Sequence, residues 1–428
     1  MLSIIIIVLC IMSLLFFLQR IVKNELLDPM FLSALYWGML VLFSMVFSAI
    51  FELEIKISGL IPIFLILAAF VTGSIIAKHV KFDIFGRKKT GTDSHDNLSK
   101  FRMACLILIF SSMGLVAIFL QLRFLNIHIG SFSDLLHAAN TISIIRYEGG
   151  TDMPKYGLVL MAFLYSAGFL GGMFTVLSRG FWNRMLAFLP FVVMILFTLT
   201  NGVKSGFILL FIIWASGYAG AWVLKYKGRM KKIGRLIRRL ALILLLILAL
   251  IPLTQALRSG KVSSKAELIN AGALSYFCSV NTFTIWYDSY DHSRLSGFRY
   301  TLSGVNNFFF SQREVGLYGN ENVVLGKYNE RLVQTNVYTM ARGLIEDFSL
   351  PGAMLVLFLT GIIAQVLYER TKRNGLMALG FLSLFYSILF WSMTVNIINY
   401  NTIILCWIIS FTALLIIKRN NFAVQQGA

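Results

Sequence analysis

The stretch Thr335-Asn-Val-Tyr-Thr-Met-Ala-Arg-Gly-Leu-Ile-Glu-Asp-Phe-Ser-Leu-Pro-Gly352 lies where the one long polar segment of the chain meets an apolar run. That polar segment extends from Arg258 to Ser349, and apolar residues predominate on both sides of it. The fold is therefore decided by two groups of long apolar segments with one large polar segment between them.

The composition excludes a water-soluble globular protein. Hydrophobic residues make up 58% of the 428 residues and charged residues only 13%, and the mean hydropathy is +0.78. Soluble domains typically contain about a quarter charged residues. We therefore expect a protein that crosses the membrane many times.

A membrane-spanning helix needs roughly 17 to 25 predominantly apolar residues. Eleven segments meet this requirement, with centres near Leu9, Met39, Leu67, Ser111, Ala167, Met194, Ile212, Leu246, Phe358, Phe385 and Ile408. No basic stretch precedes the first segment and no small-residue cleavage site follows it, so we interpret it as a span and not as a cleavable signal. The prediction is an all-α, polytopic membrane protein with about 11 transmembrane helices.

The spans divide the chain into three parts. Residues 1–256 are expected to hold helices 1 to 8, with a shorter outer loop at 121–155. Residues 257–349 form a long and partly helical outer loop, and residues 350–428 hold the last three helices.

The orientation follows from the basic residues, which resist translocation. With the N-terminus outside and the C-terminus in the cytoplasm, 24 of the 38 Lys and Arg residues fall on the cytoplasmic side. Most of the others belong to the long polar segment, which is long enough to be exempt from this rule. The positive net charge therefore mainly reflects topology, and the long polar segment is placed on the outer face.

The cationic run from Lys225 to Arg239 allows two interpretations. So dense a positive charge would attract nucleic acid, but between two spans it fits the anionic headgroups of membrane lipids better. We therefore expect membrane lipids and no nucleic acid as partners. Three of the four cysteines fall in spans, and phosphate-loop, dinucleotide and HExxH motifs are missing, so neither a metal nor another cofactor is expected.

The shorter outer loop contains a predicted interfacial helix from Ser133 to Tyr147. Apolar residues recur on one face, Ser131 or Ser133 can cap the start, and glycines follow the end. Arg146 near the C-terminal end would complement the helix dipole. Equally, its forked guanidinium could bind the phosphate of a lipid-borne substrate.

Residues Thr200 to Gly206 predict a tight outer turn between two spans, with Lys204 in it. A cation at the membrane edge often lines a site, and here the amides of the following helix could help it to bind an anion. The alternative is a lysine that reaches to the surface with its charged end.

Aromatic residues and arginines alternate in the long polar segment. Rings stack on the C–H faces of sugars while arginines and amides bind hydroxyls, although an aromatic belt at the membrane interface is the alternative. From Asn336 onward the polar residues Thr335, Thr339, Arg342 and Glu346 recur at helical spacing. Arg342 and Glu346 could therefore simply pair with each other.

Asn336-Val-Tyr-Thr, Arg342 and Glu346-Asp-Phe-Ser-Leu-Pro-Gly352 resemble the "N-x-Y-T … DFG-x-x-G" stretch of the Wzy family, the polymerases of O-antigen and capsule repeat units. The many spans, the two unequal outer loops and the short turn with Lys204 are similar too. Two positions depart from the family, because Lys204 stands where many relatives have arginine and Ser349 stands where they have glycine.

The resemblance implies a GT-C-like fold and a glycosyltransferase of the inner, cytoplasmic membrane, with a periplasmic N-terminus and a cytoplasmic C-terminus. The implied enzyme transfers a glycan from undecaprenyl pyrophosphate to the non-reducing end of a new lipid-linked unit, and a chain-length regulator is a candidate partner. Cations would neutralise the leaving pyrophosphate, and a base would accept the hydroxyl proton.

The residues implied for these tasks fall into three groups. The candidates for the phosphate clamp are Arg146, Lys204, Arg258, Arg299 and Arg342. The candidates for the base are Glu346, Asp347, Asp291 and His292. The residues expected to orient sugar hydroxyls are Asn336, Tyr338 and Thr339.

Two other functions share these features. An O-antigen ligase has the same topology and lipid donor but transfers the glycan to lipid A core. A flippase for lipid-linked oligosaccharides is the alternative that is not an enzyme, and it would favour charged or broken spans and internal repeats. The spans here carry few ionisable residues at their centres and show no repeat.

Overall fold

The structure is a computed structural model. It describes residues 18–19, 25–80, 98–128, 130–147, 153–229, 278–291, 295–310, 323–328, 331–335 and 337–418.

The described part of the chain is mostly helical. Seven helices are long and apolar enough to cross a membrane, namely α2 (Pro29–Phe51), α3 (Ile57–Val80), α4 (Lys100–Phe124), α6 (Lys155–Leu177), α7 (Phe181–Asn201), α8 (Ser205–Tyr226) and α14 (Met340–Lys372). Two shorter apolar helices follow, α15 (Leu376–Trp391) and α16 (Asn401–Ile417). Each contains the centre of a predicted span, so a polytopic helical membrane protein is confirmed. The spans predicted around Leu9 and Leu246 lie outside the described residues.

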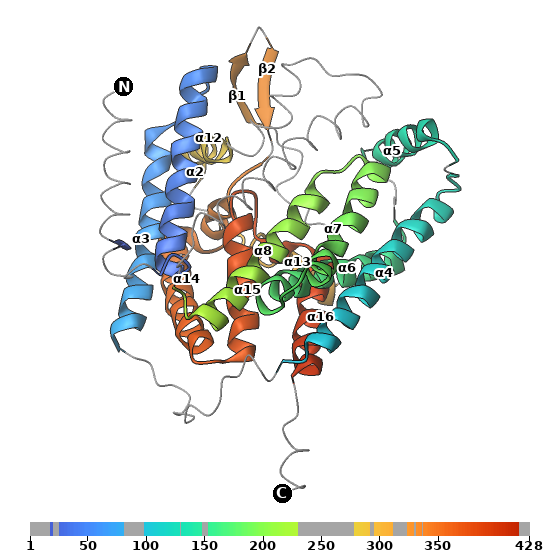
Figure 1. The fold of residues 1–428 in the computed structure, drawn as a ribbon. Coiled ribbons are helices and arrows are strands. Elements are labelled where there is room, and N and C mark those ends of the chain that lie inside the picture. The colour runs from blue at the N-terminus through green and yellow to red at the C-terminus, as the bar shows by residue number, and fades with distance from the viewer. Residues whose placement is uncertain are drawn as a thin grey trace, which may run out of the picture.

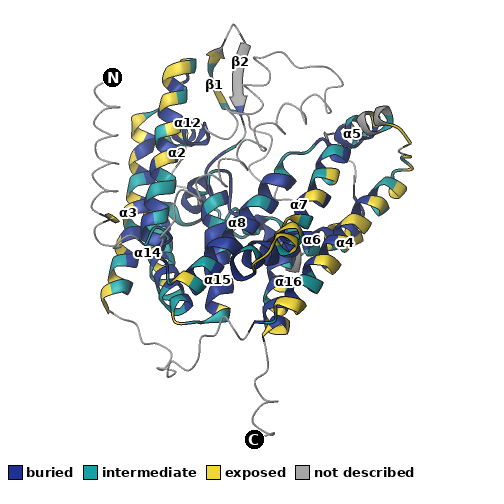
Figure 2. Ribbon diagram, in the orientation of Figure 1, coloured by how far each residue is buried: buried dark blue, intermediate teal, exposed yellow. Residues whose placement is uncertain are grey.

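The helices form two groups that are joined through the middle (Figure 1). Helices α2 and α3 pack with α14 on one side, and α4, α6 and α7 pack together on the other. Helix α8 contacts α6, α14 and α15, and α16 packs on α6. The apolar runs thus bury their shared faces against each other and leave apolar side chains on the outside of the bundle, where Figure 2 shows the exposed residues of α2 and α4.

Glycines allow two of these pairs to approach closely. A Cβ added at Gly217 of α8 would lie 2.3 Å from the carbonyl oxygen of Phe169 in α6, and one at Gly73 of α3 would lie 2.1 Å from that of Phe358 in α14. The hydroxyl of Ser74 also donates to the Gly361 carbonyl across the α3–α14 contact, at 3.2 Å. Small residues drive helix association in membranes because they let backbones touch.

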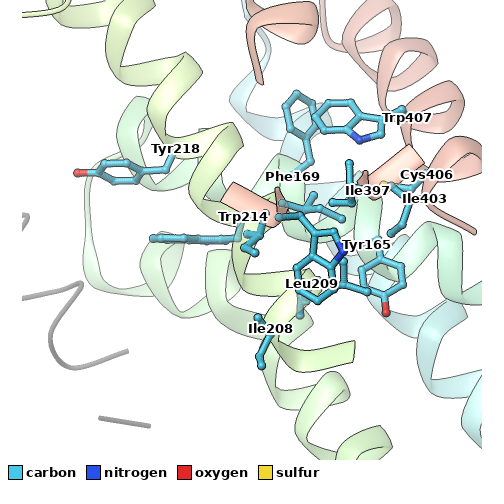
Figure 3. Close-up of a cluster of buried hydrophobic side chains, with 14 of the residues drawn as sticks. Tyr165, Phe169, Ile208, Leu209, Trp214, Tyr218, Ile397, Ile403, Cys406 and Trp407 are labelled. Atoms are coloured by element: carbon cyan, nitrogen blue, oxygen red, sulfur yellow. The ribbon is translucent and has the colours of Figure 1, made fainter. Parts of the chain in front are cut away.

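Aromatic side chains fill the centre of the molecule. Figure 3 shows Phe169, Trp214 and Trp407 gathered from α6, α8 and α16. The Phe169 and Trp407 rings lie 5.3 Å apart, and the Ser166 hydroxyl donates to the Cys406 carbonyl at 2.8 Å. These contacts fix α16 against α6.

The long polar segment is partly helical, as predicted, and it also contains strands. Its described elements are α12 (Ser279–Ser289), α13 (Ser303–Phe310), β1 (Val323–Tyr328) and β2 (Arg331–Thr335). The two strands pair antiparallel, with Val323 opposite Thr335 and Tyr328 opposite Arg331. The all-α expectation therefore omits one small hairpin. The hairpin lies at one end of the bundle (Figure 1), and this end is called the outer end below.

Residues Leu53 to Lys56, which connect α2 to α3, anchor this outer layer. The Glu54 amide donates to the Leu325 carbonyl of β1 at 2.7 Å. The side-chain amide of Asn281 in α12 donates to the Glu54 carbonyl at 2.7 Å and to the Ser48 hydroxyl at 2.6 Å. Both α12 and β1 are thus attached to the α2–α3 pair.

A network of charges joins the opposite, inner ends of α2, α3 and α14. The fully buried Asp28 caps α2 and accepts bonds from Lys78 at 3.0 Å and from Gln365 at 3.2 Å. Lys372 bridges Glu25 at 3.0 Å and Glu369 at 3.2 Å. Lys78 and Lys372 at this end of the α2–α3–α14 group therefore have carboxylate partners within the protein.

Candidate functional site

The site is built around the first turns of α14. This helix begins at Met340 with Thr339 as its N-cap residue. The helical spacing expected from Asn336 onward is therefore wrong for Thr335, because that residue pairs with Val323 in the hairpin. Only Arg342 and Glu346 of the expected polar face share a helical surface.

Arg342 and Glu346 form a buried ion pair. Nε of Arg342 donates to Oε1 of Glu346 at 2.9 Å, and the side chains are only 6% and 7% exposed. The guanidinium lies 4.0 Å from the ring centre of Tyr338 and 5.2 Å from that of Trp286. The pairing considered as an alternative from the sequence is thus present, and two rings hold the cation in addition to the carboxylate.

The end of α12 brings Tyr290 and Asp291 to the same place. The Tyr290 ring lies 4.6 Å from that of Trp286. Burial raises the pKa of the Tyr290 hydroxyl, and the negative charges of Glu346 and Asp291 raise it further. Trp286, Tyr290, Tyr338, Arg342 and Glu346 are called the aromatic-acidic cluster below.

Asp347 holds the neighbouring turn. Its carboxylate accepts the Tyr300 amide at 3.1 Å on each oxygen and the Thr301 amide at 2.6 Å. The Ser296 amide donates to the Glu346 carbonyl at 2.8 Å, so residues 296–301 are fixed against α14 at several points. Asp347 therefore suits a positioning role, whereas Glu346 and Asp291 remain the described candidates for a base.

Two asparagines that the sequence analysis did not single out complete this turn. Asn396 and Asn399 donate from their side-chain amides to the Thr301 carbonyl at 3.2 Å and the Tyr300 carbonyl at 2.8 Å. They lie in and beside the 3-10 helix η2 (Ile397–Asn399), which connects α15 to α16. Their presence between two apolar spans is the signal that could have found them.

Ser349 breaks α14 below the cluster. Its φ of 63° and ψ of 172° are not helical, and this region of backbone angles is almost restricted to glycine. Pro351 begins the next stretch of helix, where its missing amide hydrogen has no bond to lose. The break at Ser349 lies directly before Pro351 and Gly352, and the prediction that these two residues mark the entry to a span stays a prediction.

Lys204 lies in the tight turn between α7 and α8. Gly202 takes a φ of 61°, and Lys204 is the half-buried N-cap residue of α8. Asn201 and Gln121, both fully buried, exchange amide hydrogen bonds of 2.8 and 3.1 Å and so fix the turn to α4. The predicted turn is confirmed, while binding of an anion by Lys204 stays a prediction.

The interfacial helix predicted in the shorter outer loop is α5 (Phe132–Tyr147). Ser131 caps it, because its hydroxyl accepts the Asp134 amide at 3.2 Å while Asp134 accepts the Gly130 and Ser131 amides at 2.9 and 2.8 Å. These bonds lower the pKa of Asp134. Arg146 is close to the end of α5, as predicted, and its side chain lies outside the described residues.

The remaining candidates are placed as follows. Arg299 is exposed in the turn before Tyr300. Thr339 is fully buried, and its hydroxyl has no hydrogen-bond partner among the described residues. Arg258, His292 and Asn336 lie outside the described residues. The structure thus brings together Tyr338, Thr339, Arg342, Glu346, Asp347 and Asp291.

An apolar cavity of about 160 Å³ lies beside the cluster. It is enclosed by α2, α3, α14 and α15, and its lining includes Trp37, Phe70, Met340, Leu344 and Phe385. Thr301, which Asp347 holds, lies at its wall. The first turns of α14 therefore separate a charged, ring-lined cluster from a space suited to hydrocarbon.

No protein-family model, curated protein or solved structure matches this chain. The functional argument therefore rests on the residues of the site. Within the described residues, no three His, Cys, Asp or Glu side chains gather closely enough to bind a metal ion. The chemistry available in the aromatic-acidic cluster is that of one arginine, one carboxylate and three aromatic rings, and Asp291 adds a second carboxylate beside Tyr290.

Proposed function

We propose that the chain is a Wzy-type, GT-C-like glycosyltransferase that polymerises lipid-linked repeat units at the outer face of the cytoplasmic membrane. The observation that carries the proposal is the buried Arg342–Glu346 pair between Tyr338 and Trp286. A guanidinium held by rings keeps its place when an anionic substrate replaces the carboxylate as its partner.

In the proposed reaction, a hydroxyl oxygen of the acceptor sugar attacks the anomeric carbon of the donor glycan. A new C–O bond forms and the bond from that carbon to the pyrophosphate breaks, so undecaprenyl pyrophosphate leaves with the electron pair. Arg342 stabilises the charge on the leaving group, and Glu346 or Asp291 accepts the hydroxyl proton. Tyr338 and Trp286 would stack on sugar rings, and Thr339 would bind a sugar hydroxyl.

The test must separate chemistry from folding, because removing one partner of a buried ion pair destabilises a protein by about 3–5 kcal/mol. We therefore use Arg342→Met with Glu346→Leu, which replaces both charges by apolar groups of similar size. This double variant is expected to reach wild-type levels in the membrane, since apolar replacement of a buried pair is often neutral for stability.

In a deletion strain, the double variant is expected to leave single repeat units on the lipid, while the wild type restores a ladder of chain lengths on a gel. Arg123→Ala, at the exposed outer end of α4, is the matched control and should restore the ladder. A normal ladder in the double variant would show that the pair is structural only. Accumulated long lipid-linked chains would indicate a ligase, and untranslocated units would indicate a flippase; either result would overturn the proposal.

A further inference from the structure

The two helix groups differ in charge at their inner ends. Helices α4, α6, α7, α8 and α16 contain no Asp or Glu at all. At their inner ends these helices and their flanking residues carry many cations, among them Lys100, Arg102, Arg179, Arg184, Lys225 and Lys418. At the same end of α2, α3 and α14, by contrast, Lys78 and Lys372 bind Asp28, Glu25 and Glu369.

Contacts between the helices bring Lys100, Arg102, Arg179, Lys225 and Lys418 together, and Arg184 follows Arg179 in the first turn of α7. Lys225 donates to the Val176 carbonyl at the end of α6, and it experiences the positive charges of Arg179 and Lys100. Arg102 donates to the Ile416 carbonyl of α16 at 3.0 Å. Leu98 pairs with Lys418, which adds the end of α16 to the group. Like charges this close repel each other, so an anion that binds among them is stabilised by all of them.

Aromatic side chains border the same surface. Phe101 and Trp182 are each 78% exposed and Phe181 is 69% exposed. Large exposed rings at the ends of apolar helices are typical of the interface between hydrocarbon and headgroups. The surface thus combines cationic side chains with large exposed aromatic rings.

We propose that Lys100, Arg102, Arg179, Arg184, Lys225 and Lys418 form a binding surface for the headgroups of anionic phospholipids in the leaflet that this end faces. The arginines would bind the lipid phosphate through their forked donors, and the rings of Phe101, Phe181 and Trp182 would lie among the acyl chains. The occupant is a lipid and not a soluble phosphate or nucleic acid, because the rings would otherwise remain in water.

The proposal is tested with the purified full-length protein, delipidated and then placed in nanodiscs that contain phosphatidylglycerol, phosphatidylcholine or both. Bound lipid is counted by native mass spectrometry. For the triple variant Arg102→Gln, Arg179→Gln, Arg184→Gln, we expect retention of phosphatidylglycerol to fall roughly tenfold or more, since each basic residue near an anionic surface contributes about 1 kcal/mol.

Two controls make the result specific. The triple variant with Lys in place of the same arginines keeps the charge and should retain most of the phosphatidylglycerol. Arg123→Gln removes an exposed cation at the outer end of α4 and should change nothing. Equal retention by the Gln and Lys variants, equal binding of phosphatidylcholine, or displacement of the lipid by millimolar inorganic phosphate would each overturn the proposal.

Discussion

At the scale of single residues, Ser349 has backbone angles that disfavour any side chain. Its φ of 63° and ψ of 172° lie in a region that costs a non-glycine residue about 1–3 kcal/mol. We expect Ser349→Gly to raise the free energy of unfolding by about 1 kcal/mol, after allowance for the greater freedom of glycine in the unfolded chain. The melting temperature in detergent is the measurement.

Ser349→Ala is the matched control, because alanine keeps the Cβ and therefore the strain. It should be no more stable than the wild type, and a gain equal to that of the glycine variant would contradict the argument. Glycine is also the residue at this position in the family motif that the stretch from Asn336 to Gly352 resembles.

Asp347 provides a second prediction at this scale. Its carboxylate accepts amides from Tyr300 and Thr301, and an amide group in its place would direct N–H atoms toward N–H donors. We expect Asp347→Asn to destabilise the protein by about 1–3 kcal/mol and to speed hydrogen exchange in residues 296–301. Unchanged hydrogen exchange in residues 296–301 would contradict a positioning role for Asp347, whether or not polymer is lost.

At the scale of elements, the contact of α6 with α8 depends on Gly217. A methyl group there would lie 2.3 Å from the Phe169 carbonyl oxygen, so the helices would have to separate. We expect Gly217→Ala to lower the free energy of unfolding by about 1–3 kcal/mol, measured by thermal unfolding. Gly130→Ala is the control, since its nearest neighbour is 3.6 Å away; equal losses in both variants would refute close packing as the cause.

The N-terminus of α5 is expected to depend on pH. The amides of Gly130 and Ser131 lower the pKa of Asp134 in the folded protein. The ionised carboxylate therefore stabilises the start of α5 fully at pH values above the pKa of an aspartate in the unfolded chain, which is about 4. This stabilisation is lost as the pH falls through the lower pKa of Asp134 in the folded protein. Asp134→Asn should speed hydrogen exchange at the start of α5 at pH 7, whereas His137→Asn should not; protection that persists in Asp134→Asn would contradict the cap.

Local patterns predicted many of these elements. The apolar runs located the nine described apolar helices, and the Thr200–Gly206 turn and a serine cap on α5, at Ser131 or Ser133, followed from short-range chemistry. Local patterns did not predict the hairpin or the true start of α14, because Thr335 is fixed by its pairing with Val323, which is a contact between separate segments. The same holds for Asn396 and Asn399, whose partners lie almost a hundred residues earlier in the chain.

At the scale of the whole molecule, alternation of the helices places the aromatic-acidic cluster and the cationic surface at opposite ends. Ser289 of α12 is exposed beside the cluster, and Arg179 is exposed at the inner end. Cys278 and Cys406 are buried and Cys105 is partly exposed. Cysteines introduced in place of Ser289 and Arg179 therefore report on sidedness. The wild type gives the background from the native thiols.

In intact cells, Ser289→Cys is expected to react with a membrane-impermeant maleimide, because the distribution of basic residues predicts that the other end lies in the cytoplasm. Arg179→Cys should react only after the membrane is permeabilised. The reverse pattern would place the Arg342–Glu346 pair on the cytoplasmic side, where glycans already carried to the outer face are out of reach. Sidedness therefore decides whether the paired charges of α14 can meet the proposed substrate at all.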